Sequence, residues 1–237
     1  MDEKIRRDIA DYGWTILAVA ETEYLPSFAF TLGLWQEYRH PELICFGLPV
    51  QTLHHTLNLA GEMVKSGETL QTGKNYDDFF EQSQASFLQV HPDNLGDYFA
   101  YAINYYQDNN LPALQLVWQD RLGRFPWEER FEKEFEYRQP LLDRNMGFKF
   151  SESPELAVIT TKDFLEQQAP LLRVIHDPEG SWHFLTAAAG PEDIRMSSLQ
   201  ELLQQDASLN QFFNLDLGEQ AIRKTATDNW QREPADL

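Results

Sequence analysis

The stretch Ser27–Trp35, which reads SFAFTLGLW, decides the fold class of this chain. Its apolar residues form a short continuous run, a pattern typical of a buried strand. Similar runs flank it at Thr15–Ala20 and Leu43–Leu48, and polar or proline-containing segments separate the three. Three strands in quick succession predict an antiparallel sheet.

Helices are predicted among the strands that follow. Gln51–Lys65 places apolar residues at spacings of three and four, which predicts a helix that ends before Gly67. Strands are predicted at Ser86–His91 and Ala113–Trp118, with a helix over Leu95–Tyr106 between them. The elements do not alternate regularly, so we expect an α+β fold, mainly an antiparallel sheet with packed helices.

A charged segment predicts a boundary between two domains. Pro126–Gly147 is dense in charge and is interpreted as a solvated helix or a connecting segment. The predicted organisation is an α+β domain over residues 1–130, a charged connection over 131–150 and a smaller α+β domain over 151–237.

The smaller domain is predicted to hold a second sheet. Its candidate strands are Glu155–Thr161, Leu171–His176 and Ser181–Ala187. A helix is predicted over Met196–Leu203, where Ser198 and Glu201 have the spacing of a capping box. The final residues, Gln231–Leu237, are predicted to fray.

Charge is the strongest compositional signal. The chain has 38 acidic and 19 basic residues, a formal balance of -19. Residues 151–237 hold 15 acidic and 6 basic residues, so the balance is -9 there and -10 before it. Such a charge repels nucleic acid and anionic membranes and attracts cationic partners. A surface that only maintains solubility remains the alternative interpretation.

The single cysteine and the N-terminal sequence predict the compartment. Cys45 lies in the apolar run Leu43–Phe46, where we expect a buried, unreactive thiol. The N-terminus lacks the apolar stretch of a signal peptide, and no segment has the roughly 20 apolar residues of a membrane span. We therefore expect a cytoplasmic protein.

No familiar catalytic or metal-binding motif is present in the sequence. His54 and His55 are adjacent, so their side chains diverge by about 100 degrees on a helix and cannot share a metal ion. The glycines form neither a phosphate loop nor a nucleophile elbow. Asp120, before Gly123, fits either a turn or a functional carboxylate. We expect no catalytic residue, no metal site and no cofactor.

Several ordered motifs in the first half resemble a known family. They are Tyr12-Gly13-Trp14, Phe28 to Leu34 (FAFTLGL), His40 to Leu43 (HPEL), Leu114 to Asp120 (LQLVWQD) and Phe125-Pro126-Trp127. Over residues 5–130 they resemble an uncharacterised bacterial family, a domain of unknown function. The resemblance implies no catalytic residues.

The C-terminal region resembles a different family. The residues that carry the likeness are Trp182 to Leu185, Ser198 to Leu202, Asp206 to Leu209, Leu215 to Ala221 and Trp230. Over residues 155–232 they resemble a small family of immunity proteins of polymorphic toxin systems. This resemblance implies an inhibitor that covers the active site of a cognate toxin.

Charge and resemblance together favour a non-catalytic acidic protein that binds a basic toxin domain. The candidate partner-binding residues are exposed aromatics and carboxylates: Trp35, Glu37, Tyr38, Asp77, Asp78, Glu128 and Glu132. The alternative function is that of a flavin-binding oxidoreductase with a split barrel, because the order of elements and the segment Phe30–Leu34 are similar to that family. We expect neither nucleic acid nor membrane as a partner.

Overall fold

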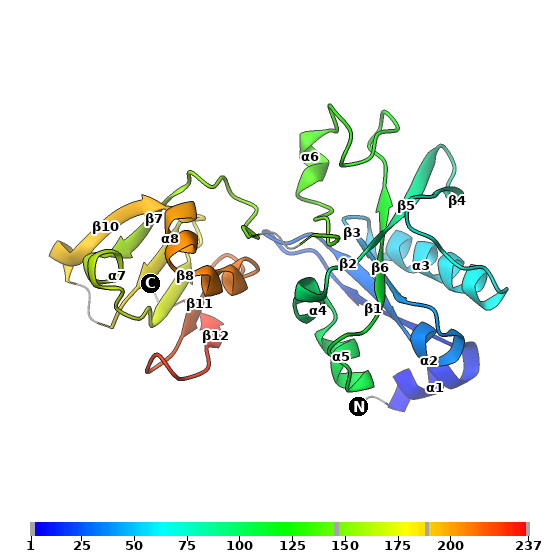
Figure 1. Ribbon diagram of the computed structural model, residues 1–237, viewed down its shortest axis with the longest axis horizontal. Helices are drawn as coiled ribbons and strands as arrows, with labels where there is room; N and C mark the ends of the chain where they lie inside the picture. The colour runs from blue at the N-terminus through cyan, green and yellow to red at the C-terminus, as the bar shows by residue number, and fades with distance from the viewer. Residues whose placement is uncertain (1–2, 145–146, 188–189, 236–237) are drawn as a thin grey trace. The chain divides into compact units, whose positions relative to one another are not determined.

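A computed structural model describes residues 3–144, 147–187 and 190–235 of the chain. The chain divides into two compact units: Met1–Thr22 with Pro26–Asn145, and Glu23–Leu25 with Met146–Leu237. Each unit has its own six-stranded mixed sheet together with helices (Figure 1). The predicted two-part α+β architecture is therefore confirmed.

The first sheet is mostly antiparallel. Its strands are β1 (Thr15–Val19), β2 (Phe28–Leu32), β3 (Glu42–Phe46), β4 (Asn75–Phe80), β5 (Ser83–Gln89) and β6 (Ala113–Trp118). Their order is β1-β2-β3-β6-β5-β4, and only β3 and β6 pair in parallel. The predicted antiparallel arrangement of β1, β2 and β3 is confirmed.

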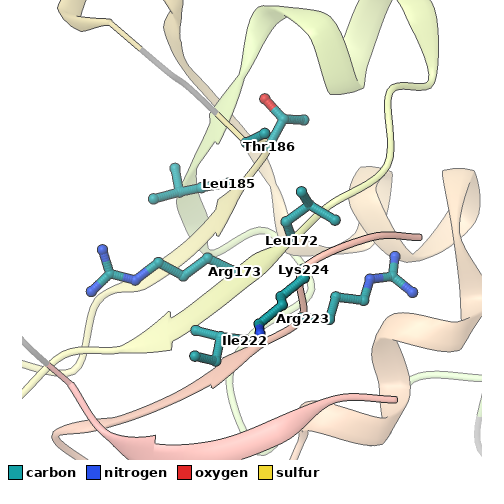
Figure 2. Close-up of a pocket in the computed structure, with 8 residues that line it drawn as sticks. Leu172, Arg173, Leu185, Thr186, Ile222, Arg223 and Lys224 are labelled. Atoms are coloured by element: carbon teal, nitrogen blue, oxygen red, sulfur yellow. The ribbon is translucent and has the colours of Figure 1, made fainter. Parts of the chain in front are cut away.

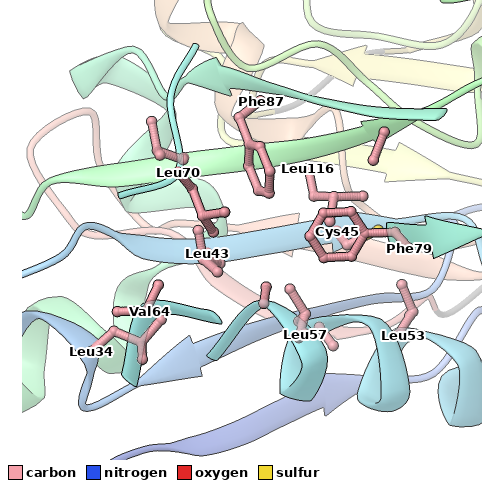
Figure 3. Packing of buried hydrophobic residues seen from close by; sticks show 14 of the residues in the cluster. Leu34, Leu43, Cys45, Leu53, Leu57, Val64, Leu70, Phe79, Phe87 and Leu116 are labelled. Carbon is pink, nitrogen blue, oxygen red and sulfur yellow. The ribbon is translucent and has the colours of Figure 1, made fainter. Parts of the chain in front are cut away.

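Helices pack against both faces of this sheet. They are α1 (Glu3–Tyr12), α2 (Leu34–Tyr38), α3 (Val50–Lys65), α4 (Pro92–Tyr98), α5 (Ala100–Tyr106) and the short α6 (Lys133–Glu136). One hydrophobic cluster joins α3 to the sheet, as Figure 3 shows, and a second cluster joins α1, α4 and α5 to it. Leu43 and Cys45 belong to the first cluster, and Ile44 and Phe46 to the second. Burial on both faces explains the continuous apolar run of β3, and Cys45 is buried as predicted.

Three expectations for the first unit are wrong. The strand predicted to reach Trp35 ends at Leu32, because Gly33 has φ 122° and α2 begins at Leu34. The helix predicted over 95–106 is two helices that meet at Phe99. The split barrel of the alternative function is absent from the part of the chain that is described, because the six strands form an open sheet with β1 and β4 at its edges.

The second sheet has the order β10-β7-β9-β8-β11-β12, and only β7 and β9 pair in parallel. Its strands are β7 (Ala157–Thr161), β8 (Arg173–His176), β9 (Trp182–Leu185), β10 (Ile194–Ser198), β11 (Glu219–Ile222) and β12 (Gln231–Pro234). The helices of this unit are α7 (Lys162–Gln167) and α8 (Leu199–Gln205), with 3₁₀ segments η1 (Pro191–Asp193) and η2 (Ala207–Phe212).

The capping box of the second unit is confirmed, although the helix begins later than predicted. The Glu201 backbone N–H donates to the Ser198 hydroxyl at 3.2 Å, and the Ser198 N–H donates to the Glu201 carboxylate at 3.3 Å. This box opens α8 at Leu199, since the preceding residues form β10. The tail predicted to fray instead forms β12, which pairs with β11. Asp236 and Leu237 lie outside the described residues.

Candidate partner-binding surface

The Asp120 loop, residues 119–132, follows β6 at one end of the first sheet. It begins with a tight turn, in which the Gly123 N–H donates to the Asp120 carbonyl at 3.0 Å and the Asp120 N–H to the Arg124 carbonyl at 2.8 Å. Gly123 has φ 74°, a conformation that favours glycine. Asp120 and Gly123 therefore form a turn, which is one of the two interpretations that the sequence allowed for Asp120.

The Asp120 carboxylate holds both ends of this loop. Its side chain is fully buried and accepts hydrogen bonds from the N–H groups of Leu122 and Arg124, both at 2.9 Å, and of Glu132 at 3.2 Å. Burial opposes the charge, but these bonds and those from the Arg124 side chain outweigh it and hold the pKa of Asp120 below its ordinary value. The carboxylate thus fixes the conformation of the loop.

The fixed loop displays apolar side chains. The rings of Phe125 and Trp127 stack with centroids 4.7 Å apart, and the Glu128 carboxylate accepts a 2.6 Å hydrogen bond from the Phe125 N–H. Phe125 is buried, whereas Trp127 is 45% exposed and Leu122 is 71% exposed. Large exposed apolar groups on a rigid loop are typical anchors of a protein interface.

Asp77 and Asp78 lie at the same end of the sheet as the Asp120 loop. Tyr76 of β4 pairs with Ala85 of β5, which in turn pairs with Trp118, the last residue of β6. Asp77 and Asp78 follow Tyr76 and therefore lie at the end of the sheet where the chain leaves β6. Gln84 connects the two segments: its side-chain amide donates to Asp77 at 2.8 Å, and its backbone N–H donates to the Gln119 side chain at 2.7 Å.

Most carboxylates here are not neutralised by cations. Of those named so far, Glu132 pairs with Arg121 at 3.3 Å and Asp120 pairs with Arg124 at 2.8 Å. Within the described ranges, five others lie more than 4.0 Å from any Lys, Arg or His nitrogen: Asp77, Asp78, Glu81, Glu128 and Glu129. We call these five residues, together with Leu122 and Trp127, the acidic end. Its charge favours a cationic partner.

The remaining predicted residues lie at the opposite end of this sheet, on α2. Trp35 is half-buried, and its backbone N–H donates to the Glu42 carboxylate at 3.0 Å. Tyr38 is also half-buried and packs edge-on against Trp14, at 6.4 Å between ring centroids. Glu37 is exposed. The structure thus brings Asp77, Asp78, Glu128 and Glu132 toward one end and separates them from the α2 residues.

Sequence reasoning did not select Leu122, Trp127, Glu81 or Glu129 as binding residues. The sequence feature that could have indicated them is the aromatic segment Phe125–Trp127, which comes directly after a turn in a charged stretch. The segment did not reveal which of its side chains is exposed: Phe125 is buried and Trp127 is exposed, although they are only two positions apart.

Neither a metal site nor a membrane-spanning helix is found among the described residues. Among them, no three His, Cys, Asp or Glu side chains are grouped so that they could hold a metal ion. No described helix has the length and apolar character needed to cross a membrane.

Comparison with known proteins identifies the first unit. Residues 8–132 match the model of the family described as Domain of unknown function (DUF4262). No curated protein and no solved structure matches the chain. The family match spans more than half of the 237 residues and includes β1–β6 and the Asp120 loop. The chain therefore belongs to the DUF4262 family.

Proposed function

We propose that this chain is a non-catalytic binding protein whose acidic end captures a cationic protein. The observation that carries the proposal is the hydrogen-bonded Asp120 loop, which displays Leu122 and Trp127 at the same end of the sheet as five carboxylates that have no cation partner among the described residues. The specific function proposed is that of a cytoplasmic immunity protein, which neutralises a cognate basic toxin domain by covering its active site.

The two kinds of residue have separate roles in this proposal. Trp127 and Leu122 supply affinity, because exposed apolar anchors gain most when a partner desolvates them. The carboxylates, Asp77 and Asp78 among them, raise the association rate through long-range attraction. Hydrogen bonds to Asp120 keep the loop ordered before binding, which lowers the entropy cost of association.

The choice of a toxin as the partner depends on the second unit. Residues 155–232 resemble immunity proteins, a class that inhibits toxins by direct binding. The net charge of -19 agrees with a basic target. Co-expression with the protein encoded by the adjacent gene tests the proposal: a basic toxin domain should stop growth alone and should be tolerated together with this chain.

Binding kinetics with that domain test the surface. Trp127→Ala should weaken binding by at least roughly 10-fold, mainly by faster dissociation. The pair Asp77→Lys and Asp78→Lys should slow association at low salt, and the difference should shrink as salt screens the charges.

Glu37→Lys is the matched control, because Glu37 is an exposed carboxylate on α2 at the other end of the sheet. It should change association less than the pair of aspartate reversals does. Slower association with Glu37→Lys alone would place the interface on α2 instead. A basic toxin domain that is neither bound nor neutralised by this chain contradicts the proposed function itself.

A further inference from the structure

A groove with a volume of about 610 Å³ lies at the ends of three neighbouring strands of the second sheet (Figure 2). Register places Leu185 of β9, Arg173 of β8 and Ile222 of β11 in one row across the sheet. The described lining residues are Leu172, Arg173, Leu185, Thr186, Ala187, Ile222, Arg223 and Lys224. The volume is in the range of small-molecule sites.

The charge of this groove is opposite to that of the unit around it. The second unit has 16 acidic and 7 basic residues in its sequence. Three of those basic residues, Arg173, Arg223 and Lys224, line the groove, and no carboxylate is among its described lining residues. A concentration of cations against the overall balance indicates a local preference for anions.

Arg223 is held in place by contacts that do not neutralise it. Its Nε donates to the Leu171 carbonyl and its Nη1 to the Ala226 carbonyl, both at 2.9 Å. Its guanidinium group also lies over the Trp230 ring, 4.3 Å from the centroid. A preorganised guanidinium loses little entropy when it binds a carboxylate or a phosphate.

Lys224 adds a second cation that is accessible. It is exposed, and in the part of the chain that the structure describes no carboxylate lies within 4.0 Å of its ammonium group. Figure 2 shows Lys224 beside Ile222, with the guanidinium groups of Arg173 and Arg223 directed to opposite sides. The cations therefore lie around the apolar side chains of Leu185 and Ile222 instead of converging on one point.

We propose that this groove binds an organic anion, with an apolar body on Leu185 and Ile222 and a terminal phosphate or carboxylate beside Lys224. A charged hydrogen bond from Lys224 would hold the anionic group, and the guanidinium groups on either side would add electrostatic attraction. The dispersed cations favour an extended ligand over free inorganic phosphate. This binding is independent of the proposed capture of a basic protein by the first unit.

Titration with phenyl phosphate tests the proposal, with benzyl alcohol as the neutral probe and inorganic phosphate as the compact one. The whole ¹⁵N-labelled chain is titrated at millimolar concentrations, and amide shifts are followed by NMR. Phenyl phosphate should shift the amides of Leu172, Ile222 and Lys224 in a saturable manner. The other two probes should bind more weakly.

Lys224→Gln should weaken the binding of phenyl phosphate roughly 2- to 5-fold, which is the effect of losing one exposed charge pair. Lys162→Gln removes a cation of the same unit outside the groove, on α7, and should leave binding unchanged. Arg223→Gln removes a cation at the side of the groove and should weaken binding less than Lys224→Gln does; where circular dichroism shows that this variant is unfolded, Lys224→Gln decides. Absence of saturable binding, or equal weakening by Lys224→Gln and Lys162→Gln, overturns the proposal.

Discussion

The Arg124 guanidinium contacts a single oxygen of Asp120: Nε donates to Oδ2 at 2.9 Å, and Nη2 lies 2.8 Å from the same atom. The other oxygen, Oδ1, accepts from the backbone N–H groups of Leu122 and Arg124. One buried carboxylate thus connects a side chain, a turn and, through the Glu132 N–H, the far end of the loop.

Asp120→Asn should destabilise the first unit by about 2 kcal/mol, because an amide leaves buried donors without a charged acceptor. Urea unfolding measures the free energy. Glu129→Gln also removes one negative charge, but from an exposed side chain, and should change stability by less than about 0.5 kcal/mol. Equal stability of the two variants would show that the carboxylate does not fix the loop.

The stability contributed by Asp120 should depend on pH in a defined direction. Because the folded-state pKa is lowered, the contribution is complete above the ordinary aspartate pKa of about 3.9 and is lost as pH falls through the folded value. The difference in unfolding free energy between wild type and Asp120→Asn should therefore shrink in acid. A difference that stays constant between about pH 6 and pH 3 contradicts this assignment.

Tyr106→Phe should lower the free energy of unfolding of the first unit by about 1 to 2 kcal/mol. The Tyr106 hydroxyl donates to the buried Glu42 carboxylate at 2.5 Å and accepts from the Gly33 N–H at 2.8 Å. Tyr101→Phe, on the same helix, is the matched control, since the Tyr101 side chain is 39% exposed. Similar losses in both variants would argue against a specific role for the Tyr106 hydroxyl.

The same variant should show a pH dependence. Burial raises the pKa of Glu42, and hydrogen bonds from Thr31 and Tyr106 partly reverse that shift. Loss of the Tyr106 bond raises the folded pKa further, so the cost of Tyr106→Phe should be largest where the carboxylate is ionised, above that pKa. Unfolding free energies measured from acidic to mildly alkaline pH check the sign.

Two glycines in helices should respond to alanine in opposite directions. A Cβ at Gly61 in α3 would lie 2.4 Å from the Trp14 ring, so Gly61→Ala should destabilise by about 1 to 3 kcal/mol. A Cβ at Gly96 in α4 would meet nothing within 4 Å, so Gly96→Ala should stabilise by about 0.5 to 1 kcal/mol. Thermal and urea unfolding compare the variants, and a stabilising Gly61→Ala would contradict the packing of Trp14.

Local patterns in the sequence were sufficient for the elements that depend on near neighbours. The apolar period of Val50–Lys65 and the capping box at Ser198 and Glu201 both appear in the structure, because helical spacing and caps involve residues only three or four positions apart. The acidic balance was also visible in composition alone. β4 was missed because NYDDFF mixes buried rings with exposed aspartates on an edge strand.

Only the tertiary structure decided which charges form a surface. Asp77 and Glu128 are about fifty positions apart, and they reach the same end of the sheet because β5 lies between β4 and β6. Strand order is a non-local choice that minimises exposed apolar area over the whole unit, and no short window of sequence encodes it. For the same reason Trp35, a predicted binding residue, lies at the opposite end of the sheet from Glu128, with which it was grouped in the prediction.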